Sequence, residues 1–242
     1  MALLLALSVV ESRRHPSTPP PTPNNDNFSV VSYLPEYRFY LNVDDIALHT
    51  TDLILFSVAP NSQGNLQYYL SPQHFNQALK ARQAKAELLP DQPKLRILVS
   101  VGGGGRSNNF MKIASDASYR RTVVSELKEL CERYSLDGVD FDWEAPTTQE
   151  ETAAYIRLLH ETHSVFHNTG LLVTVALHPG QTLGMNGFHA VDRVHLMTYD
   201  MSMNRRGNHA EFVEVKNAAE MLVVTGCPKE KIGEYFYGAM CS

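Results

Sequence analysis

The chain has 242 residues, enough for one large domain or two small ones. Its hydrophobic share of 43% and charged share of 19% are ordinary for a soluble globular protein. The net charge is −5 and there is no basic run, so nothing suggests a nucleic-acid partner. Three cysteines without Cys-x-x-Cys spacing argue against a disulfide framework or a zinc site. We therefore predict no metal centre.

Residues 1–26 differ in composition from the rest of the chain. Residues 2–10 form an apolar run that is too short to span a bilayer but fits the hydrophobic region of a signal peptide. A positively charged start and a clean cleavage site are missing, so a disordered tail is the alternative. Residues 17–23 are rich in proline and cannot form a helix or an inner strand. We expect a secreted protein, with an intracellular or lysosome-like compartment as the alternative, and a folded domain at 27–242.

From residue 27 onward, short apolar runs alternate with longer amphipathic ones. The apolar runs suit parallel strands that are buried on both faces, and they predict strands at 28–34, 52–59, 95–101, 138–143, 171–177 and 194–198. Apolar residues at helical spacing predict helices at 71–89, 117–134 and 149–167. Repeated strand–helix–strand units require parallel pairing, so the sequence predicts a (β/α) barrel or a doubly wound sheet.

A dinucleotide site would need Gly-x-Gly-x-x-Gly at a turn from strand to helix. The glycines at 102–105 follow a predicted strand, but residue 107 is serine and no phosphate-loop lysine accompanies them. We therefore expect no nucleotide and no other cofactor.

The strand at 138–143 leads into an acidic run. Alternate side chains of a strand share a face, so Asp140, Asp142 and Glu144 point one way and the apolar side chains between them point the other. Crowded carboxylates raise one another's pKa, and a glycosidase needs a carboxyl that is still protonated near neutral pH. Glu144 lies nearest the carboxyl end of the strand, where the sites of such barrels open. We therefore predict that Glu144 is a catalytic acid.

Two simpler interpretations of the acidic run stay open. The first is a solvated edge strand or turn, against which the flanking apolar residues argue. The second is an Asp-x-Asp site for magnesium or calcium, against which the lack of a phosphate-binding loop argues.

Three motifs in chain order carry a resemblance to a known family. They comprise Asp137, Asp140, Asp142 and Glu144; then Ser100, Gly102 and Gly103; then Met197, Tyr199 and Asp200. With these motifs, the chain resembles glycoside hydrolase family 18, the chitinases and their relatives, over roughly residues 28–238. The resemblance implies a TIM (β/α)8-type barrel and endo-acting hydrolysis of β-1,4-linked N-acetylglucosamine polymers. Chitin or a related oligosaccharide is thus the expected partner.

The resemblance also implies a retaining mechanism in which the N-acetyl oxygen of the substrate attacks the anomeric carbon. Glu144 would protonate the leaving oxygen and then activate water. Asp142 would orient the acetamide, Asp140 would modulate Asp142, and Tyr199 would hold the acetamide oxygen. The substrate-binding residues that it implies are Tyr33, Ser100, Gly102, Gly103, Trp143, Met197 and Asp200.

Several of these residues also have a structural interpretation. Ser100 could bond the backbone inside the barrel, the two glycines could serve a tight turn, and Met197 could fill the core. His195 shares a strand face with Met197 but lies deeper, and we predict that it is a hydrogen-bonded core residue.

The C-terminal segment departs from the family pattern. A helix at 217–226 and a seventh strand at 231–238 are predicted, and the eighth strand, with the tryptophan that it brings in the family, is missing. We therefore expect an incomplete barrel of about seven strands, with a minimal fifth helix between residues 177 and 194. A weakly active or inactive chitin-binding, lectin-like protein and a non-functional fragment are the alternatives to an enzyme. The sequence leaves open the choice among chitin, peptidoglycan and an N-glycan core, and also the oligomeric state.

Overall fold

Seven parallel strands form one curled sheet in the computed structural model, which describes residues 29–144, 146–199, 201 and 210–235. The order in the sheet is β1-β2-β4-β5-β6-β7-β8, and β3 pairs with β2 in the antiparallel sense. The strands are β1 (Val31–Pro35), β2 (Asp52–Pro60), β3 (Leu66–Tyr68), β4 (Arg96–Gly102), β5 (Gly138–Asp142), β6 (Leu172–Leu177), β7 (Arg193–Met197) and β8 (Ile232–Tyr235).

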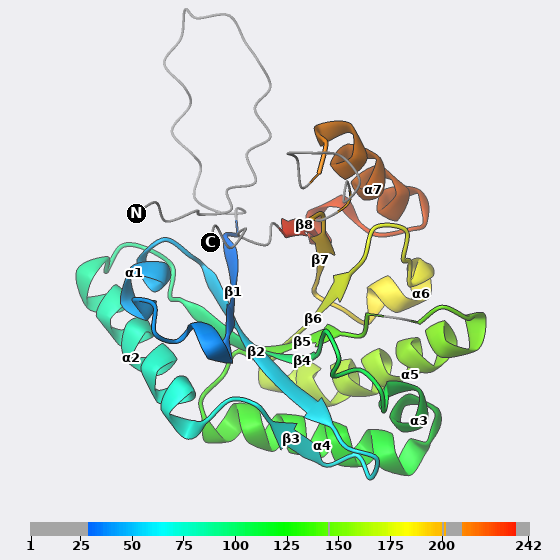
Figure 1. Ribbon diagram of the computed structural model, residues 1–242, viewed down its shortest axis with the longest axis horizontal. Coiled ribbons are helices and arrows are strands. Elements are labelled where there is room, and N and C mark those ends of the chain that lie inside the picture. The colour runs from blue at the N-terminus through cyan, green and yellow to red at the C-terminus, as the bar shows by residue number, and fades with distance from the viewer. Residues whose placement is uncertain (1–28, 145, 200, 202–209, 236–242) are drawn as a thin grey trace, which may run out of the picture.

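The helices cover the convex side of this sheet, and the concave side faces the open part of the molecule (Figure 1). They are α1 (Val43–Leu48), α2 (Pro72–Leu88), α3 (Phe110–Ser115), α4 (Ala117–Arg133), α5 (Gln149–Phe166), α6 (Gly184–His189) and α7 (Phe212–Val224). Within the described ranges, β1 pairs only with β2 and β8 only with β7 among the parallel strands. The architecture is therefore a half barrel, which confirms the prediction of a barrel that is incomplete with about seven strands.

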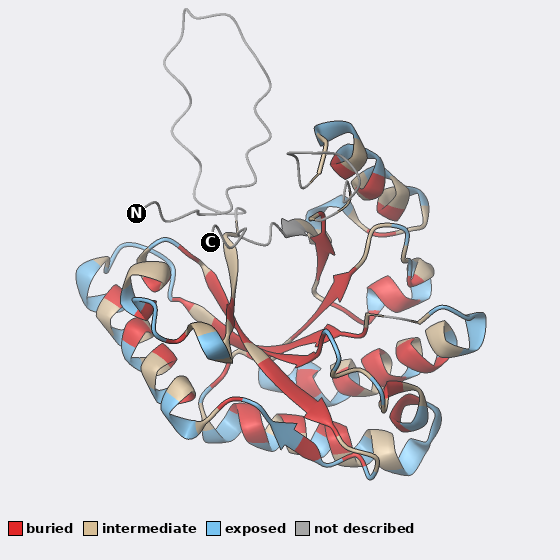
Figure 2. Ribbon diagram, in the orientation of Figure 1, coloured by how far each residue is buried: buried red, intermediate tan, exposed pale blue. Residues whose placement is uncertain are grey.

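The buried core lies between the strands and the helices. Figure 2 shows that the central strands β2, β4, β5, β6 and β7 are buried along most of their length, whereas exposed residues gather on the outer sides of the helices. Strand β5 illustrates the cause, because Val139 and Phe141 point outward into the helical layer and are fully buried. Burial of such side chains stabilises by roughly 1.5–3 kcal/mol each, so the helical layer holds the sheet in its curl.

Helix starts follow local capping chemistry. Thr148 and Glu151 form a reciprocal capping box at the start of α5, and Asp116 accepts hydrogen bonds from the backbone of Ser118 and Tyr119 at the start of α4. Helix α7 begins at Phe212 rather than at the predicted residue 217, because Glu211 and Glu214 form a capping box there. Glutamate is not among the usual N-cap residues, so the sequence did not mark this start.

Three short elements were not predicted, namely α1, α3 and β3. Each helix has six residues and the strand has three, so none is long enough to show a hydrophobic period. The predicted fifth helix is found as the six-residue α6. The predicted seventh strand is found as β8, whereas residues 236–238 lie outside the described residues, as does the signal-like run at 2–10.

An acid and two arginines join β2 to its neighbour β4 and to the distant strand β7 at the amino ends of the sheet. Asp52 at the start of β2 accepts hydrogen bonds from Arg96 of β4, at 2.5 and 2.8 Å, and from Arg193 of β7, at 3.0 Å. Burial alone would raise the pKa of Asp52, but the bonds and charges of these arginines outweigh burial and lower it. The network therefore links one side of the half barrel to the other.

Removing the charge of Asp52 tests this link. Asp52→Asn keeps the shape but leaves two guanidinium groups without a counter-charge, so we expect a loss of about 3 kcal/mol in the free energy of unfolding. Lys128→Met removes one partner of the exposed Lys128–Glu132 pair on α4 and should cost less than about 0.5 kcal/mol. Urea unfolding followed by circular dichroism measures both, and equal losses would contradict the structural role of Asp52.

Candidate active site

The acidic run lies on the concave face of the sheet at the carboxyl ends of the strands. Asp140 and Asp142 are side by side with Ser100 and Gly102 of β4 in the strand register. Asp140 is 0% exposed and Asp142 is 6% exposed, whereas Glu144 just beyond the strand is only partly buried. The strand alternation thus places three carboxyls on one face, at increasing distance from the core.

Hydrogen-bond donors surround Asp140. Tyr33 of β1 donates to its Oδ2 at 2.7 Å, and Thr174 of β6 donates to its Oδ1 at 2.5 Å. The Nδ1 atom of His195 on β7 lies 3.1 Å from the same Oδ1 atom. Side chains from three strands therefore fix this carboxylate at the centre of the curl.

Asp142 is in the opposite situation. Its Oδ1 atom is buried and has no hydrogen-bond partner within the described structure. Burial raises the pKa of Asp142 well above its usual value, and the charges of Asp140 and Glu144 add to this effect. Asp142 therefore retains a proton more readily than an exposed carboxyl group does.

Glu144 faces the glycine-rich loop after β4. A Cβ atom placed on Gly104 would lie 3.4 Å from Glu144 Oε1, so this carboxyl group stands directly over the glycine. The side-chain amide of Gln181 donates to the backbone oxygen of Glu144 at 3.3 Å, and Gln181 accepts from the backbone of His178 at 2.7 Å. The loop after β6 thereby holds the backbone at Glu144.

Glycines provide the space around Asp142. The φ angle of Gly103 is +93°, and a Cβ atom there would lie 2.2 Å from Phe56 Cζ and 3.2 Å from Asp142 Oδ2. The backbone N–H of Gly103 donates to the Asp142 carbonyl at 2.7 Å. Gly102 has a φ of +100°, and a Cβ atom there would lie 2.6 Å from the same carbonyl. Both predicted glycines therefore contact β5 directly, where a larger side chain would not fit.

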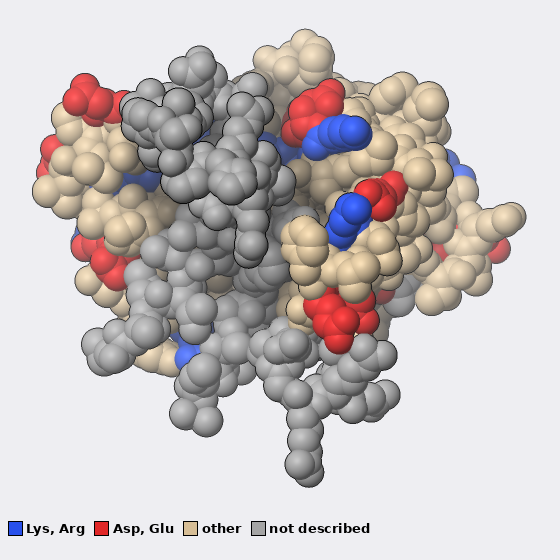
Figure 3. Space-filling view, turned by 90° about the horizontal axis from the view of Figure 1, so that it is seen from above, with Lys and Arg blue, Asp and Glu red and all other residues tan. Residues whose placement is uncertain are grey.

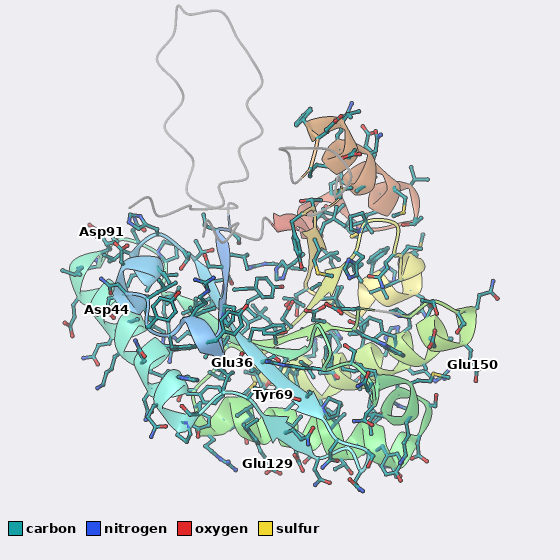
Figure 4. All side chains as sticks on the ribbon, viewed as in Figure 1. Glu36, Asp44, Tyr69, Asp91, Glu129 and Glu150 are labelled. Atoms are coloured by element: carbon teal, nitrogen blue, oxygen red, sulfur yellow. The ribbon has the colours of Figure 1, made fainter. Side chains whose placement is uncertain are left out.

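Arg106, in the loop after β4, connects the segment after β1 with β2 and with the segment after β3. Its guanidinium pairs with Glu36 and donates to Ser57 Oγ at 2.8 Å. The same group lies 3.9 Å from the ring centroid of Tyr69 and 5.0 Å from that of Phe56. Glu36 and Tyr69 accordingly lie close together at one edge of the concave side (Figure 4). Since Phe56 also abuts Gly103, this cluster supports the wall beside Asp142.

The third motif is described only in part. Met197 is buried at the end of β7, and the Tyr199 hydroxyl donates to its sulfur at 3.3 Å. Asp200 lies outside the described residues. Ser100 is fully buried on the concave side and its Oγ atom has no partner in the described structure, so it does not bond the backbone.

The structure does not bring Trp143 to the carboxyl group cluster. Its ring is 3% exposed and packs against Phe110 of α3, at 5.3 Å between centroids, and Tyr155 of α5, at 5.2 Å. The alternation that points the acids inward points this tryptophan outward into the helical layer. Asp137 also lies apart, at the amino end of β5, where it pairs with Arg82 at 2.9 Å and accepts from the backbone of Ile97.

Other kinds of site find little support in the described residues. No group of three or more histidine, cysteine or acidic side chains among them is placed to hold a metal ion. None of their helices is both long and apolar enough to cross a membrane. On the face seen from above, acidic and basic side chains occur in small groups of both signs (Figure 3).

Four contributors to the site were not predicted as site residues from the sequence. Arg106 and Gln181 lie in loops, where the sequence has no periodic pattern that could identify them. Thr174 and His195 contact Asp140 from neighbouring strands, and their alternation with apolar residues was the available signal. His195 is indeed a hydrogen-bonded core residue, as predicted, but the sequence did not identify its partner.

A curled parallel sheet with carboxyl groups at the carboxyl ends of its strands defines an α/β-barrel protein with the acidic groups that glycosidic-bond hydrolysis requires. Residues 29–238 match the family described as "Glycosyl hydrolases family 18", and the chain belongs to this family. This finding agrees with the resemblance carried by the three sequence motifs.

Individual relatives are distant in sequence. An endochitinase of Manduca sexta is 23% identical over 251 residues, which cover 86% of this chain and 45% of the relative. "Probable chitinase 2" of Drosophila melanogaster is 28% identical over 169 residues, covering 60% of this chain and 35% of the relative. The chain thus spans less than half the length of these two relatives.

Solved structures support the fold. A family GH18 chitinase from Cycas revoluta has a TM-score of 0.72 and 25% identity, covering 84% of this chain and 67% of that one. The group IV chitinase of Ostrinia furnacalis has a TM-score of 0.68 and 24% identity, covering 86% and 66%. The half barrel therefore corresponds to about two thirds of these chains.

Enlarging Gly103 tests the close packing beside Asp142. Gly103→Ala combines a clash with Phe56 and a positive φ, so we expect the free energy of unfolding to fall by about 2–4 kcal/mol. Gly105→Ala is a matched control, because its φ is +71° but nothing lies within 4 Å of the added carbon. It should cost about 1 kcal/mol. Similar losses for the two variants in urea unfolding would show that the contact with Phe56 is unimportant.

Neutralising Asp142 tests its protonation. Because its pKa is higher in the folded than in the unfolded chain, the folded protein binds more protons, and stability falls as the pH rises above the unfolded value of about 3.9. Asp142→Asn removes this penalty, so we expect it to stabilise the protein at pH 7 by about 1.4 kcal/mol for each unit by which the pKa is raised.

The stabilisation by Asp142→Asn should shrink toward pH 4, because there the carboxyl group is protonated in the folded chain and about half protonated in the unfolded chain. Exposed Asp91→Asn should change the unfolding free energy by less than about 0.5 kcal/mol at both pH values. Urea unfolding at pH 7 and pH 4 provides the comparison. A stabilisation that does not depend on pH, or a loss of stability at pH 7, would refute the assignment.

Proposed function

We propose that the chain hydrolyses β-1,4-glycosidic bonds in chitin or a related N-acetylglucosamine glycan, with Glu144 as general acid and base. The observation that carries the proposal is the pair formed by Glu144 and Asp142. Glu144 is partly exposed over a glycine, and Asp142 lies deeper on the same face with its pKa raised by burial and by its two acidic neighbours. Glu144 can therefore reach a leaving oxygen, while Asp142 favours its protonated form beside it.

The mechanism that suits this pair is retaining and uses the substrate as its own nucleophile. The N-acetyl oxygen would attack the anomeric carbon as Glu144 gives its proton to the leaving oxygen, which breaks the glycosidic bond and forms a cyclic oxazolinium ion. Glu144, now a carboxylate, would take a proton from water as that water opens the ring. Two successive inversions at the anomeric carbon retain its configuration.

The remaining residues have supporting roles in this proposal. Asp142 would turn toward the acetamide N–H, accept its hydrogen bond and stabilise the positive ion. Asp140 would stay below, held by its three donors, and Tyr199 would direct its hydroxyl at the acetamide oxygen. Gly102 and Gly103 would keep the wall thin enough for Asp142 to turn. Tyr33, Ser100, Met197 and Asp200 would complete the substrate-binding face.

The substrate class is supported by ligands named for related structures. The Cycas revoluta enzyme was solved with (GlcNAc)3 and with allosamidin, and a tobacco class V chitinase variant was solved with NAG4. We propose the same class of N-acetylglucosamine oligosaccharide here. The proposal includes cleavage within the glycan chain rather than at its end. It also includes secretion of the protein, which the apolar run at 2–10 supports.

A fluorogenic chitobioside tests the catalytic role of Glu144. Glu144→Gln keeps the size of the side chain but cannot donate or accept the proton, so we expect the rate of release to fall by about 10²-fold or more. Glu150→Gln, at an exposed position on α5, should leave the rate unchanged. Thermal melts of all three proteins show whether they are folded.

Equal rates of release for the wild type and Glu144→Gln would refute the catalytic role of Glu144. The alternative of a lectin-like protein predicts a different pattern, in which the folded wild type releases no fluorophore but binds N-acetylglucosamine oligosaccharides in calorimetry. The absence of both release and binding would exclude this substrate class.

A further inference from the structure

A buried histidine stands beside the deepest carboxyl group of the site. His195 is 3% exposed, and its Nδ1 atom lies 3.1 Å from Asp140 Oδ1 and 3.0 Å from the Tyr33 hydroxyl. Its Nε2 atom is buried and has no hydrogen-bond partner in the described structure. None of the three sequence motifs includes this residue, and the proposed mechanism gives it no step.

Counting hydrogens fixes the orientation of this contact. Tyr33 has one phenolic hydrogen, which it donates to Asp140 Oδ2 at 2.7 Å. With Asp140 ionised, its oxygens and the phenolic oxygen can otherwise only accept, so the hydrogen between them and the imidazole comes from Nδ1. The neutral ring therefore carries its proton on Nδ1, and the unpartnered Nε2 atom is bare.

The donation from His195 completes the coordination of Asp140. Thr174 donates to Oδ1 at 2.5 Å, so the two oxygens of Asp140 receive three hydrogen bonds in all, from β1, β6 and β7. A carboxylate with three donors is stabilised in its charged form. Asp142 has no donor on Oδ1, and a proton shared between the two acids is therefore best placed on Asp142.

The packing around the ring shows that this position is built for an imidazole. The Tyr33 ring meets it edge to face, with 6.0 Å between centroids. On the other side, β8 presents Gly233, where an added Cβ atom would lie 3.7 Å from His195 Cδ2. The ring thus fills the space between β1 and β8, and it cannot turn freely away from Asp140.

We propose that His195 is a positioning residue whose Nδ1–H fixes Asp140 as the unprotonated member of the Asp140–Asp142 pair. Asp142 then keeps the proton and is free to turn toward the substrate. The catalytic consequence rests on the proposed function, whereas the tautomer of His195 does not. The two parts can therefore be tested separately.

The tautomer is tested on the full chain without substrate. Two-bond ¹H–¹⁵N correlations of histidine-labelled protein distinguish Nδ1–H from Nε2–H rings, and the His195 ring is assigned through its backbone resonances. We expect the Nδ1–H pattern at His195. A ring protonated only on Nε2 would overturn the proposal, whatever the protein does to a glycan.

A pair of amide variants tests the catalytic part. The side-chain N–H of His195→Asn lies near the position of Nδ1, and that of His195→Gln lies near the position of Nε2. We expect His195→Asn to keep kcat on the chitobioside within about threefold, and His195→Gln to lose about tenfold or more with little change in KM, since a hydrogen bond to a charged group is lost. Thermal melts confirm that both variants fold.

The outcomes separate this proposal from the proposed function. Equal losses of kcat in two folded variants would assign His195 a packing role only and overturn the proposal. A wild type that releases no fluorophore would refute the proposed function, and the tautomer measurement would still decide whether His195 donates to Asp140.

Discussion

Two carboxyl groups with unequal partners, Asp140 and Asp142, are the constraint on which the site depends. The two-residue period of β5 forces them onto the same buried face, where neither reaches bulk water. Three strands then supply donors to the deeper group and none to the Oδ1 atom of the outer one. Burial and the neighbouring charges consequently raise the pKa of Asp142. The curl of the sheet matters because it brings β1, β6 and β7 close enough to reach one residue of β5.

The same constraint explains the wall of glycines and aromatic rings beside the acids. Asp142 can change its orientation only if the space next to it is free of side chains, and Gly103 leaves that space. A glycine-rich loop is conformationally permissive, however, and would lose this shape without support. Phe56 packs against the loop, and Arg106 holds Phe56 in place through Glu36, Ser57 and Tyr69. In the proposed mechanism, this supported wall leaves Asp142 the space to turn.

How far the sequence predicts this arrangement depends on the range of each interaction. Period-two alternation is local, and it placed Asp140, Asp142 and Glu144 on one face without knowledge of the fold. The same rule pointed Trp143 outward, against the substrate-binding role that the resemblance implied, and here the local rule agrees with the structure. Contacts that depend on the curl, such as His195 with Asp140, join residues 55 positions apart and leave no local pattern. Short elements such as α3 are also invisible, since they complete no hydrophobic period.

The two ends of the sheet show that position on a strand does not by itself decide what a buried acid does. Asp52 at the amino end lies among arginines that lower its pKa, so it stays charged and joins strands. Among the described residues, both charged groups that shift the pKa of Asp142 at the carboxyl end are acids, so they add to the effect of burial and raise it. Arg106, which supports the wall beside Asp142, is already paired with Glu36 and Ser57. These partners keep the guanidinium of Arg106 engaged away from Asp142, and a guanidinium next to Asp142 would instead favour its charged form and lower its pKa.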